Sequence, residues 1–177
     1  MNGSLDGARA VLVIAHHGFR EEELDAPRAA LAAAGVVVRV ASSSLAPATG
    51  MHGGQATPDL LYCAVRPEDV DALVFVGGTG AAEFFHDRTA HRLAREALRA
   101  GKVVGALCYA SSVLAEAGLL EGRPATGWPS REGHLRARGA AWTGAPVTVD
   151  GRVVTGRGPD DAAAFGQALV AAMTRRD

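Results

Sequence analysis

The stretch KVVGALCYASSVLAEAGLL, residues 102–120, places one cysteine where two sequence patterns meet. The residues that lead to Cys108 form a continuous apolar run, which is typical of a strand buried on both faces of a parallel sheet. The residues from 111 to 120 have the composition and spacing of a helix. A sharp strand-to-helix turn needs small residues, because backbone passes close to backbone there. The small residues around this junction are Gly105, Ala106, Ala110 and Ser111.

The same alternation of apolar runs and helical patterns continues on both sides of this stretch. Strands are predicted at 10–17, 36–43, 71–78 and 102–108, with shorter ones within 124–130 and 140–144. Helices are predicted at 23–35, 87–101, 111–120 and 161–173. Residues 44–70 are expected to be irregular with a short hairpin, and 147–159 to form a hairpin with a type I′ turn at Asp150–Gly151. Short links between alternating elements predict an α/β fold with a mostly parallel sheet and helices on both faces.

The composition is that of an ordinary globular protein, and one domain spanning 1–177 is the simplest organisation. The chain has 177 residues, 48% hydrophobic and 21% charged, with a formal net charge of −1. That charge and the lack of a dense basic patch predict no nucleic-acid or membrane partner. The start of the chain lacks the positive region of a signal peptide, so a cytoplasmic location is expected. No zinc-type ligand spacing is present, and neither a metal nor a cofactor is expected.

Cys108 is the first candidate for chemistry. Ligands in such sheets bind beyond the carboxyl ends of the strands, which points to the segments 16–23 and 77–83 and to Cys108. A thiol at the start of a helix feels unpaired N–H groups and the positive end of the helix dipole, which predicts a lowered pKa. The backbone N–H of Tyr109 would point at the same place, as an oxyanion donor does. The alternative is a buried cysteine with a structural role.

Two further segments supply candidate partners for this thiol. Glu23 precedes an apolar stretch that ends at Pro27, and a protonated carboxyl there could donate to the thiolate and move a proton. Glu21 and Glu22 are better explained as solvated residues at a helix start. The run FVGGTG is not GxGxxG, so a dinucleotide site is disfavoured, and a tight glycine turn that offers the N–H of Gly78 is the preferred interpretation.

Three motifs together resemble those of the ThiJ/PfpI superfamily, which includes the Parkinson-disease protein deglycase and the intracellular PfpI-type proteases. They are REEELDAP at 20–27, FVGGTGAAEFF at 75–85 and GALCYASSVLAEAGLLEGRPATGWPS at 105–130, and the resemblance extends over residues 8–173. It implies a flavodoxin-like three-layer sandwich that forms a homodimer or a larger homo-oligomer. It also implies a reactive elbow cysteine at Cys108, a buried glutamate at Glu23, and oxyanion donors on the backbone of Gly78 and Tyr109.

The sequence departs from this family pattern at two positions. The PfpI-type proteases carry a histidine directly after the cysteine, where this chain has Tyr109, and deglycase-like members carry one after the elbow helix, where this chain has Trp128. Proteolysis is therefore disfavoured, because amide cleavage needs an acid that protonates the leaving nitrogen. Other histidines could approach the thiol, although each is better explained as a surface or packing residue. They are His17, His52, His86 and His134.

The preferred hypothesis is a cofactor-independent enzyme of glyoxalase or deglycase type that acts on a small 2-oxoaldehyde. Cys108 would be the nucleophile and Glu23 the proton shuttle, with Gly78 and Tyr109 holding the oxyanion. One alternative is a redox-sensing stress protein in which Cys108 is oxidised without turnover. Another is a different cysteine-dependent hydrolase or hydratase. Cys63 is expected to be a spare thiol, and Trp128 to shape the substrate cavity.

Overall fold

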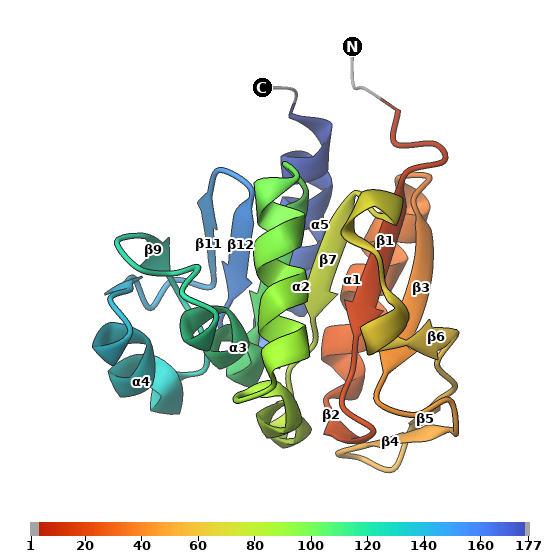
Figure 1. The fold of residues 1–177 in the computed structure, drawn as a ribbon, viewed down its shortest axis with the longest axis horizontal. Helices are drawn as coiled ribbons and strands as arrows, with labels where there is room; N and C mark the ends of the chain where they lie inside the picture. The colour runs from red at the N-terminus through yellow and green to blue at the C-terminus, as the bar shows by residue number, and fades with distance from the viewer. Residues whose placement is uncertain (1–3, 176–177) are drawn as a thin grey trace.

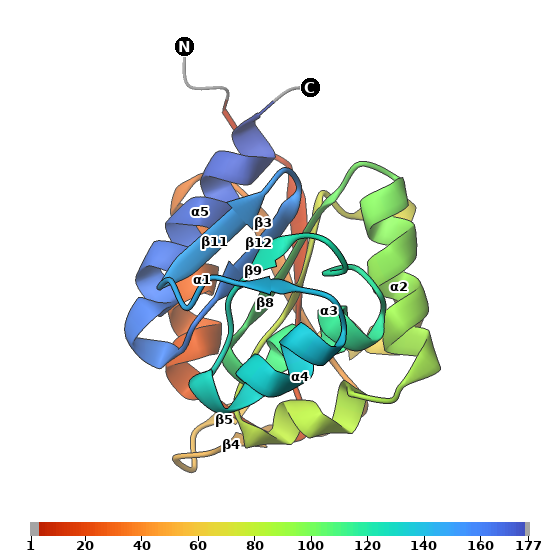
Figure 2. The ribbon, with the colours of Figure 1, turned by 90° about the vertical axis from the view of Figure 1, so that its left-hand side faces the viewer.

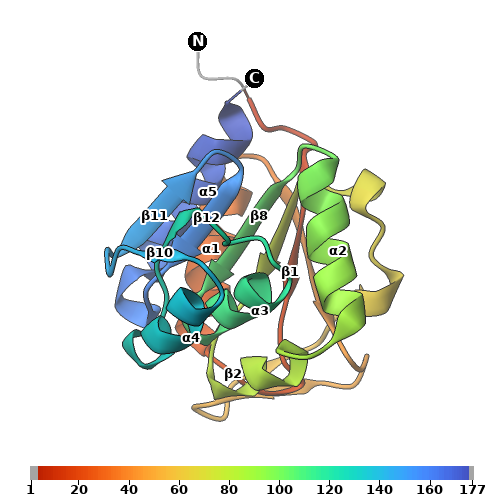
Figure 3. The same cartoon turned by 60° about the vertical axis from the view of Figure 1, so that its left-hand side comes forward.

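The computed structural model describes residues 4–175 and has three layers, with a central sheet between two layers of helices (Figure 1). Figure 2 shows α1 and α5 on one face of the sheet and α2 on the other. The short helix α3 follows the strand β8 and packs against α2, and α4 packs against α3 (Figure 3). The helices are α1 (Glu21–Ala33), α2 (Arg88–Arg99), α3 (Ser111–Glu116), α4 (Glu132–Ala137) and α5 (Ala162–Thr174). This arrangement confirms the predicted three-layer, flavodoxin-like sandwich.

The central sheet has seven strands in the order β11-β12-β8-β7-β1-β3-β6, and only the β11–β12 pair is antiparallel. Its strands are β1 (Arg9–Val13), β3 (Val37–Ser42), β6 (Leu60–Leu61), β7 (Ala72–Phe75), β8 (Val103–Leu107), β11 (Val147–Asp150) and β12 (Val153–Gly156). A second sheet contains β2 (His17–Phe19), β4 (Ala48–Gly50) and β5 (Gln55–Ala56), and a third contains β9 (Pro124–Ala125) and β10 (Ala141–Trp142). Short 3₁₀ helices cover Tyr62–Ala64, Pro67–Asp69, Thr79–Phe84, Cys108–Ala110, Pro129–Arg131 and Pro159–Asp161.

Burial explains why the middle strands read as unbroken apolar runs. Every residue of β7 and β8 is buried, because helices cover both faces of the sheet. Alternate side chains enter two separate cores. Phe75 and Leu93 belong to the core under α2 and α3, whereas Leu12 and Phe165 belong to the core under α1 and α5. Among the described residues, no helix has the length and apolar character needed to cross a membrane.

The register of the parallel strands determines where the functional segments meet. Val13 is paired with Phe75, and Phe75 with Ala106, so β1, β7 and β8 end at nearly the same level. In the sheet, β3 lies on one side of the neighbouring pair β1 and β7, and β8 lies on the other side. The connections that follow β1 and β7 therefore lead in opposite directions, and the topological switch point of this fold lies between the ends of these two strands. Ligands bind in the crevice outside the strand ends at such a point. The segments that follow β1, β7 and β8 are therefore brought to one place.

Several predicted element boundaries were wrong. The first strand ends at Val13 and not at residue 17, because the chain leaves the central sheet and His17 pairs in the second sheet with β4. The first helix begins at Glu21, so all three glutamates lie in its first turn. The helix predicted to reach residue 120 ends at Glu116, and Gly118 then adopts a positive φ of 79°.

Further differences concern two elements that were not predicted and the turn of the last hairpin. The helix α4 and the edge strand β6 were not predicted, since both lie in short segments without clear periodicity. In the last hairpin Asp150 pairs with Val153, so the two-residue turn is Gly151–Arg152. Within residues 4–175 only Gly151 of this pair has a positive φ, so the turn is not type I′, which requires positive φ at both central residues.

Candidate active site

Cys108 occupies a strained turn between β8 and α3. Its φ is 60°, and it is the only non-glycine residue with a positive φ among residues 4–175. A positive φ at a residue with a side chain costs free energy and is concentrated at functional sites. Here it turns the chain directly from the strand into a 3₁₀ helix over Cys108–Ala110, as in a nucleophile elbow. The carbonyl of Cys108 accepts a hydrogen bond from the Trp128 N–H at 3.2 Å, which ties the turn to the following segment.

Two glycines leave the space that the elbow needs. A Cβ atom at Gly77 would lie 2.7 Å from the Cβ of Cys108 and would overlap the carboxyl of Glu23. A Cβ atom at Gly127 would lie 2.8 Å from the Oγ of Ser111. Both distances are too short for any residue with a side chain, so glycine is needed because of close approach rather than unusual backbone angles.

Glu23 lies in the first turn of α1 beside the Cys108 thiol, and it is 1% exposed. Burial raises the pKa of its carboxyl to about 7. The nearby Cys108 thiol, the Arg20 guanidinium and the Gly77 N–H favour the ionised form but offset only part of this effect. Neither carboxyl oxygen has a partner with full hydrogen-bond geometry in the described part of the chain. The carboxyl can therefore exchange a proton near neutral pH and has free capacity for a ligand.

The pKa of Cys108 corrects the sequence-based expectation of a lowered value. The residue is 5% exposed, and burial raises the pKa of the thiol. An ionised Glu23 raises it further, whereas the backbone N–H groups of Gly78 and Tyr109 lower it. The elbow does aim two N–H donors at the sulfur, but it also buries the sulfur next to an acid. Because two like charges in contact are unfavourable, the pair carries at most one negative charge near neutral pH.

A cavity of about 200 Å³ opens above this pair. Its lining consists of Arg20, Glu23, Met51, Gly78, Thr79, Cys108, Tyr109, Trp128 and Pro159. The structure thus brings together the four site residues predicted from sequence, and it places Trp128 in the wall. Met51 and Trp128 are 41% and 37% exposed, so they form an apolar rim at the mouth.

The remaining lining residues were missed from the sequence, for different reasons. Arg20 stands within the quoted motif REEELDAP, and its place next to the acids was an available signal. Pro159 follows β12, whose carboxyl end lies at the same edge of the sheet as that of β8. Met51 gave no signal, because it lies in the loop between β4 and β5, and only the three-dimensional structure folds that loop over the elbow.

None of the candidate histidines lines this cavity. His134 lies on α4, where its Nδ1 is 3.1 Å from the Oγ of Ser112 and its Nε2 is 2.6 Å from the Oε1 of Glu116. These contacts hold α4 against α3, which supports the interpretation of His134 as a packing residue. His17, His52 and His86 are likewise absent from the lining. Glu23 is therefore the one side chain of the cavity that titrates near neutral pH and can act as a base.

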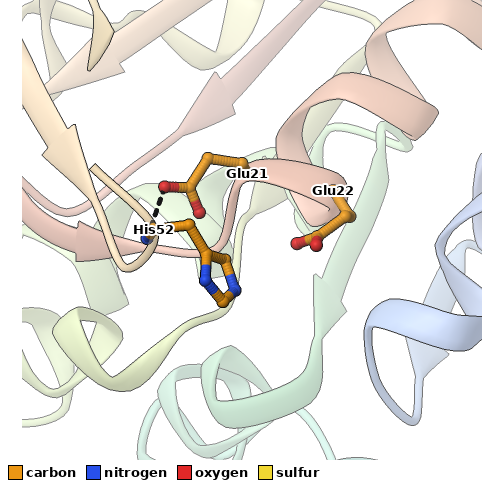
Figure 4. Close-up of side chains that lie close together, drawn as sticks. All are labelled: Glu21, Glu22 and His52. Carbon is orange, nitrogen blue, oxygen red and sulfur yellow. Dashed lines mark hydrogen bonds between the residues drawn. The ribbon is translucent and has the colours of Figure 1, made fainter. Parts of the chain in front are cut away.

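The other two glutamates at the start of α1 have a separate role. Figure 4 shows Glu21, Glu22 and His52 close together, and all three are absent from the lining of the cavity. The Oε1 of Glu21 accepts the backbone N–H of His52 at 2.7 Å and that of Gly54 at 3.2 Å. Glu21 is thus not simply solvated, as the sequence suggested: it holds the β4–β5 loop that carries Met51 to the cavity. Glu22 is 51% exposed and pairs with Arg20 at 2.8 Å.

Comparisons with known proteins find relatives that are similar in sequence and in fold. The family model described as the DJ-1/PfpI family matches residues 8–172. A deglycase of Pyrococcus horikoshii is 34% identical over 151 residues, covering 85% of this chain and 91% of that protein. YraA of Bacillus subtilis, named provisionally as a cysteine protease, is 31% identical, covering 89% of this chain and 94% of that protein. The crystal structure of a ThiJ/PfpI domain protein from Brachyspira murdochii superposes with a TM-score of 0.93 at 28% identity, covering 97% of this chain and 99% of that one.

Proposed function

This chain belongs to the DJ-1/PfpI family, and we propose that it is a cysteine-dependent enzyme that converts small 2-oxoaldehydes into 2-hydroxy acids. The observation that carries the proposal is the contact between a buried carboxyl of pKa about 7 and the thiol of the elbow cysteine. A group with such a pKa can take up and return a proton at neutral pH, which suits general acid–base catalysis. The similarity to a protein named as a deglycase supports chemistry at carbonyl compounds.

The first step is addition of the thiol to the aldehyde. The sulfur of Cys108 forms a bond to the aldehyde carbon, the π electrons of the carbonyl move to its oxygen, and the thiol proton passes to the carboxylate of Glu23. The N–H groups of Gly78 and Tyr109, which already face the sulfur, are placed to stabilise the oxygen as it becomes negative. Glu23 then returns the proton to that oxygen, and a hemithioacetal results. A raised thiol pKa is compatible with this route, because the base that removes the proton lies beside it.

The second step moves a proton between the two carbons of the substrate. Glu23 takes the proton from the carbon bonded to sulfur, which gives an enediol, and delivers it to the neighbouring carbon. The hydroxyl proton on the sulfur-bearing carbon passes to the oxygen of the former ketone, so that a thioester of the 2-hydroxy acid results. Water then attacks the thioester carbon, the carbon–sulfur bond breaks, and the thiol regains its proton. The sum is aldehyde plus water giving hydroxy acid. Oxidation of one carbon balances reduction of the other, so the chemistry requires no external oxidant or cofactor.

The size and lining of the cavity favour a small substrate. Sites for drug-sized ligands measure roughly 300–1,000 Å³, and this cavity has about 200 Å³. The lining also lacks a histidine that could protonate a leaving amine, which disfavours amide hydrolysis. Oxidation of Cys108 without turnover is the alternative function, because the same thiol and neighbouring carboxyl would serve it.

The test is lactate formation from methylglyoxal by the purified protein and three variants. We expect turnover by the wild type, none by Cys108→Ser, and a loss of about 100-fold or more in Glu23→Gln. Cys63→Ser is the matched control, since Cys63 is exposed and outside the cavity, and it should retain activity. A wild type without turnover would refute the proposal. Stable oxidation of Cys108 by peroxide in such a protein would support the redox-sensing alternative.

A further inference from the structure

Arg20 stands at the mouth of the cavity on a fixed backbone. It is the residue before α1, and its backbone N–H donates to the carbonyl of Gly77 at 3.0 Å. Its side chain lines the cavity and is 28% exposed. Within residues 4–175 the guanidinium makes one hydrogen bond, from Nε to Glu22 at 2.8 Å. The two terminal nitrogens donate to no described residue, so they remain available to a ligand.

The lining of the cavity contains one positively charged side chain and few other charged groups. Apart from the Glu23–Cys108 pair, Arg20 is the only charged residue in the lining. The other members are uncharged: Met51, Gly78, Thr79, Tyr109, Trp128 and Pro159. A molecule that approaches the sulfur of Cys108 therefore moves past the positive charge of Arg20, which lies next to the apolar rim of Met51 and Trp128. A positive charge beside an otherwise uncharged rim attracts an anionic ligand toward the site.

We propose that Arg20 selects 2-oxoaldehydes that carry a carboxylate, by donating from its terminal nitrogens to that group while the aldehyde carbon faces Cys108. This proposal rests on the proposed function and names its substrate class. A guanidinium presents parallel N–H groups that match the two oxygens of a carboxylate. One arginine balances the single charge of a carboxylate, whereas a phosphate ester carries more charge, about −1.5 to −2. The small volume leaves room for a chain of only a few carbons.

The neighbouring Glu22 does not cancel this charge. Its side chain is 51% exposed and lies outside the cavity lining. Exposed pairs of this kind are weak, because water screens them. The bond to Glu22 uses Nε and orients the guanidinium, while the two terminal nitrogens make no hydrogen bond to a described residue. Glu22 is thus suited to positioning Arg20 rather than to neutralising it.

The first experiment compares a matched pair of substrates, anionic 4,5-dioxopentanoate and neutral 2-oxopentanal. We expect the wild type to prefer the anion in kcat/KM by about tenfold or more, as a charge-assisted hydrogen bond provides. Arg20→Gln should bring the ratio close to one, and Arg20→Lys should retain part of it. Addition of about 0.5 M KCl should lower the wild-type ratio of the two kcat/KM values, because salt screens the charge of Arg20. Arg28→Gln is the control, because Arg28 lies on the same helix, is exposed and is outside the cavity.

A second experiment does not depend on turnover. Iodoacetate and iodoacetamide both alkylate a thiol with loss of iodide, and they differ in charge. We expect the rate ratio of iodoacetate to iodoacetamide at Cys108 to fall at least about threefold in Arg20→Gln, as the loss of one partly screened positive charge predicts. The ratio at the exposed Cys63 of the same protein should stay constant. Peptide mass spectrometry measures both sites in one sample.

The two experiments separate the possible failures. Turnover with equal charge preference in the wild type and Arg20→Gln overturns the role of Arg20 and leaves the proposed function intact. No turnover of either aldehyde, together with a charge-dependent alkylation ratio, overturns the proposed function and supports an anion-selective thiol site. If neither turnover nor the alkylation ratio depends on Arg20, the proposal is refuted.

Discussion

The carboxyl of Glu23 lies beside the thiol of Cys108, and the two side chains are 1% and 5% exposed. Glu23 comes from the helix that follows β1, and Cys108 from the end of β8, with β7 between these strands in the sheet. Water reaches neither group freely, so a negative charge on one makes a charge on the other unfavourable. The pair therefore behaves as one site with a shared proton.

The rate should depend on pH through this pair. Glu23 must be ionised to accept the thiol proton, so kcat/KM for methylglyoxal should rise with pH and level off above an apparent pKa of about 7. The apparent value belongs to the pair and not to one residue. In Glu23→Gln the residual activity should lack this inflection. A pH profile of both proteins measures it, and an unchanged inflection in the variant would assign the titration to another group.

Stability should depend on pH through the same residue, in the opposite sense. The folded protein holds the Glu23 proton up to a pKa of about 7, whereas the unfolded chain loses it near the ordinary glutamate pKa of 4.5. The contribution of this raised pKa to the free energy of unfolding is therefore fully present below about pH 4.5 and is lost as the pH rises through about 7. A shift of this size corresponds to roughly 3 kcal/mol. Urea unfolding should show Glu23→Gln gaining stability relative to wild type between about pH 5 and about pH 8. A constant difference over that range would contradict the raised pKa.

The glycine beside the elbow should tolerate no side chain. Gly77→Ala puts a Cβ atom 2.5 Å from the carbonyl oxygen of Leu107 and 2.7 Å from the Cβ of Cys108. Overpacking of this kind costs about 1–3 kcal/mol, and the displacement should also separate Glu23 from the thiol. Gly133→Ala is the matched control, since nothing lies within 4 Å of its Cβ position on α4. Thermal unfolding and turnover measure both effects, and full activity in Gly77→Ala would contradict the contact.

Trp128 should influence which aldehydes are accepted. It lines the cavity, is 37% exposed, and lies against Gly158, whose Cβ position is 2.9 Å from the indole ring. Trp128→Ala removes apolar wall, so kcat/KM should fall more for 2-oxopentanal than for methylglyoxal. Loss of a contact with two methylene groups predicts a difference of about tenfold. Trp142→Ala is the control, because Trp142 packs against the core outside the cavity and should affect stability without changing the preference.

The elements that carry the site were predictable from local patterns. The elbow at Cys108 could be predicted without knowledge of distant segments, because all of its signals lie within one stretch of sequence. These signals are the apolar run before the cysteine, the small residues around it and the helical pattern after it. The pKa of the same thiol was predicted in the wrong direction. Helix N–H groups are local and were visible in the sequence, but burial and the charge of Glu23 come from elements far along the chain.

The sequence by itself determined the layered α/β fold, the elbow at Cys108 and the set of segments from which partners could come, because periodicity, small residues and turn glycines act over short distances. Only the tertiary structure decided that Glu23 touches the thiol and that its pKa is about 7. The tertiary structure also decided that Arg20, Met51 and Trp128 enclose the cavity while the histidines do not. The physical reason is the strand order. β7 separates β1 from β8 in the sheet, and pairing between strands that are distant in sequence sets both proximity and burial.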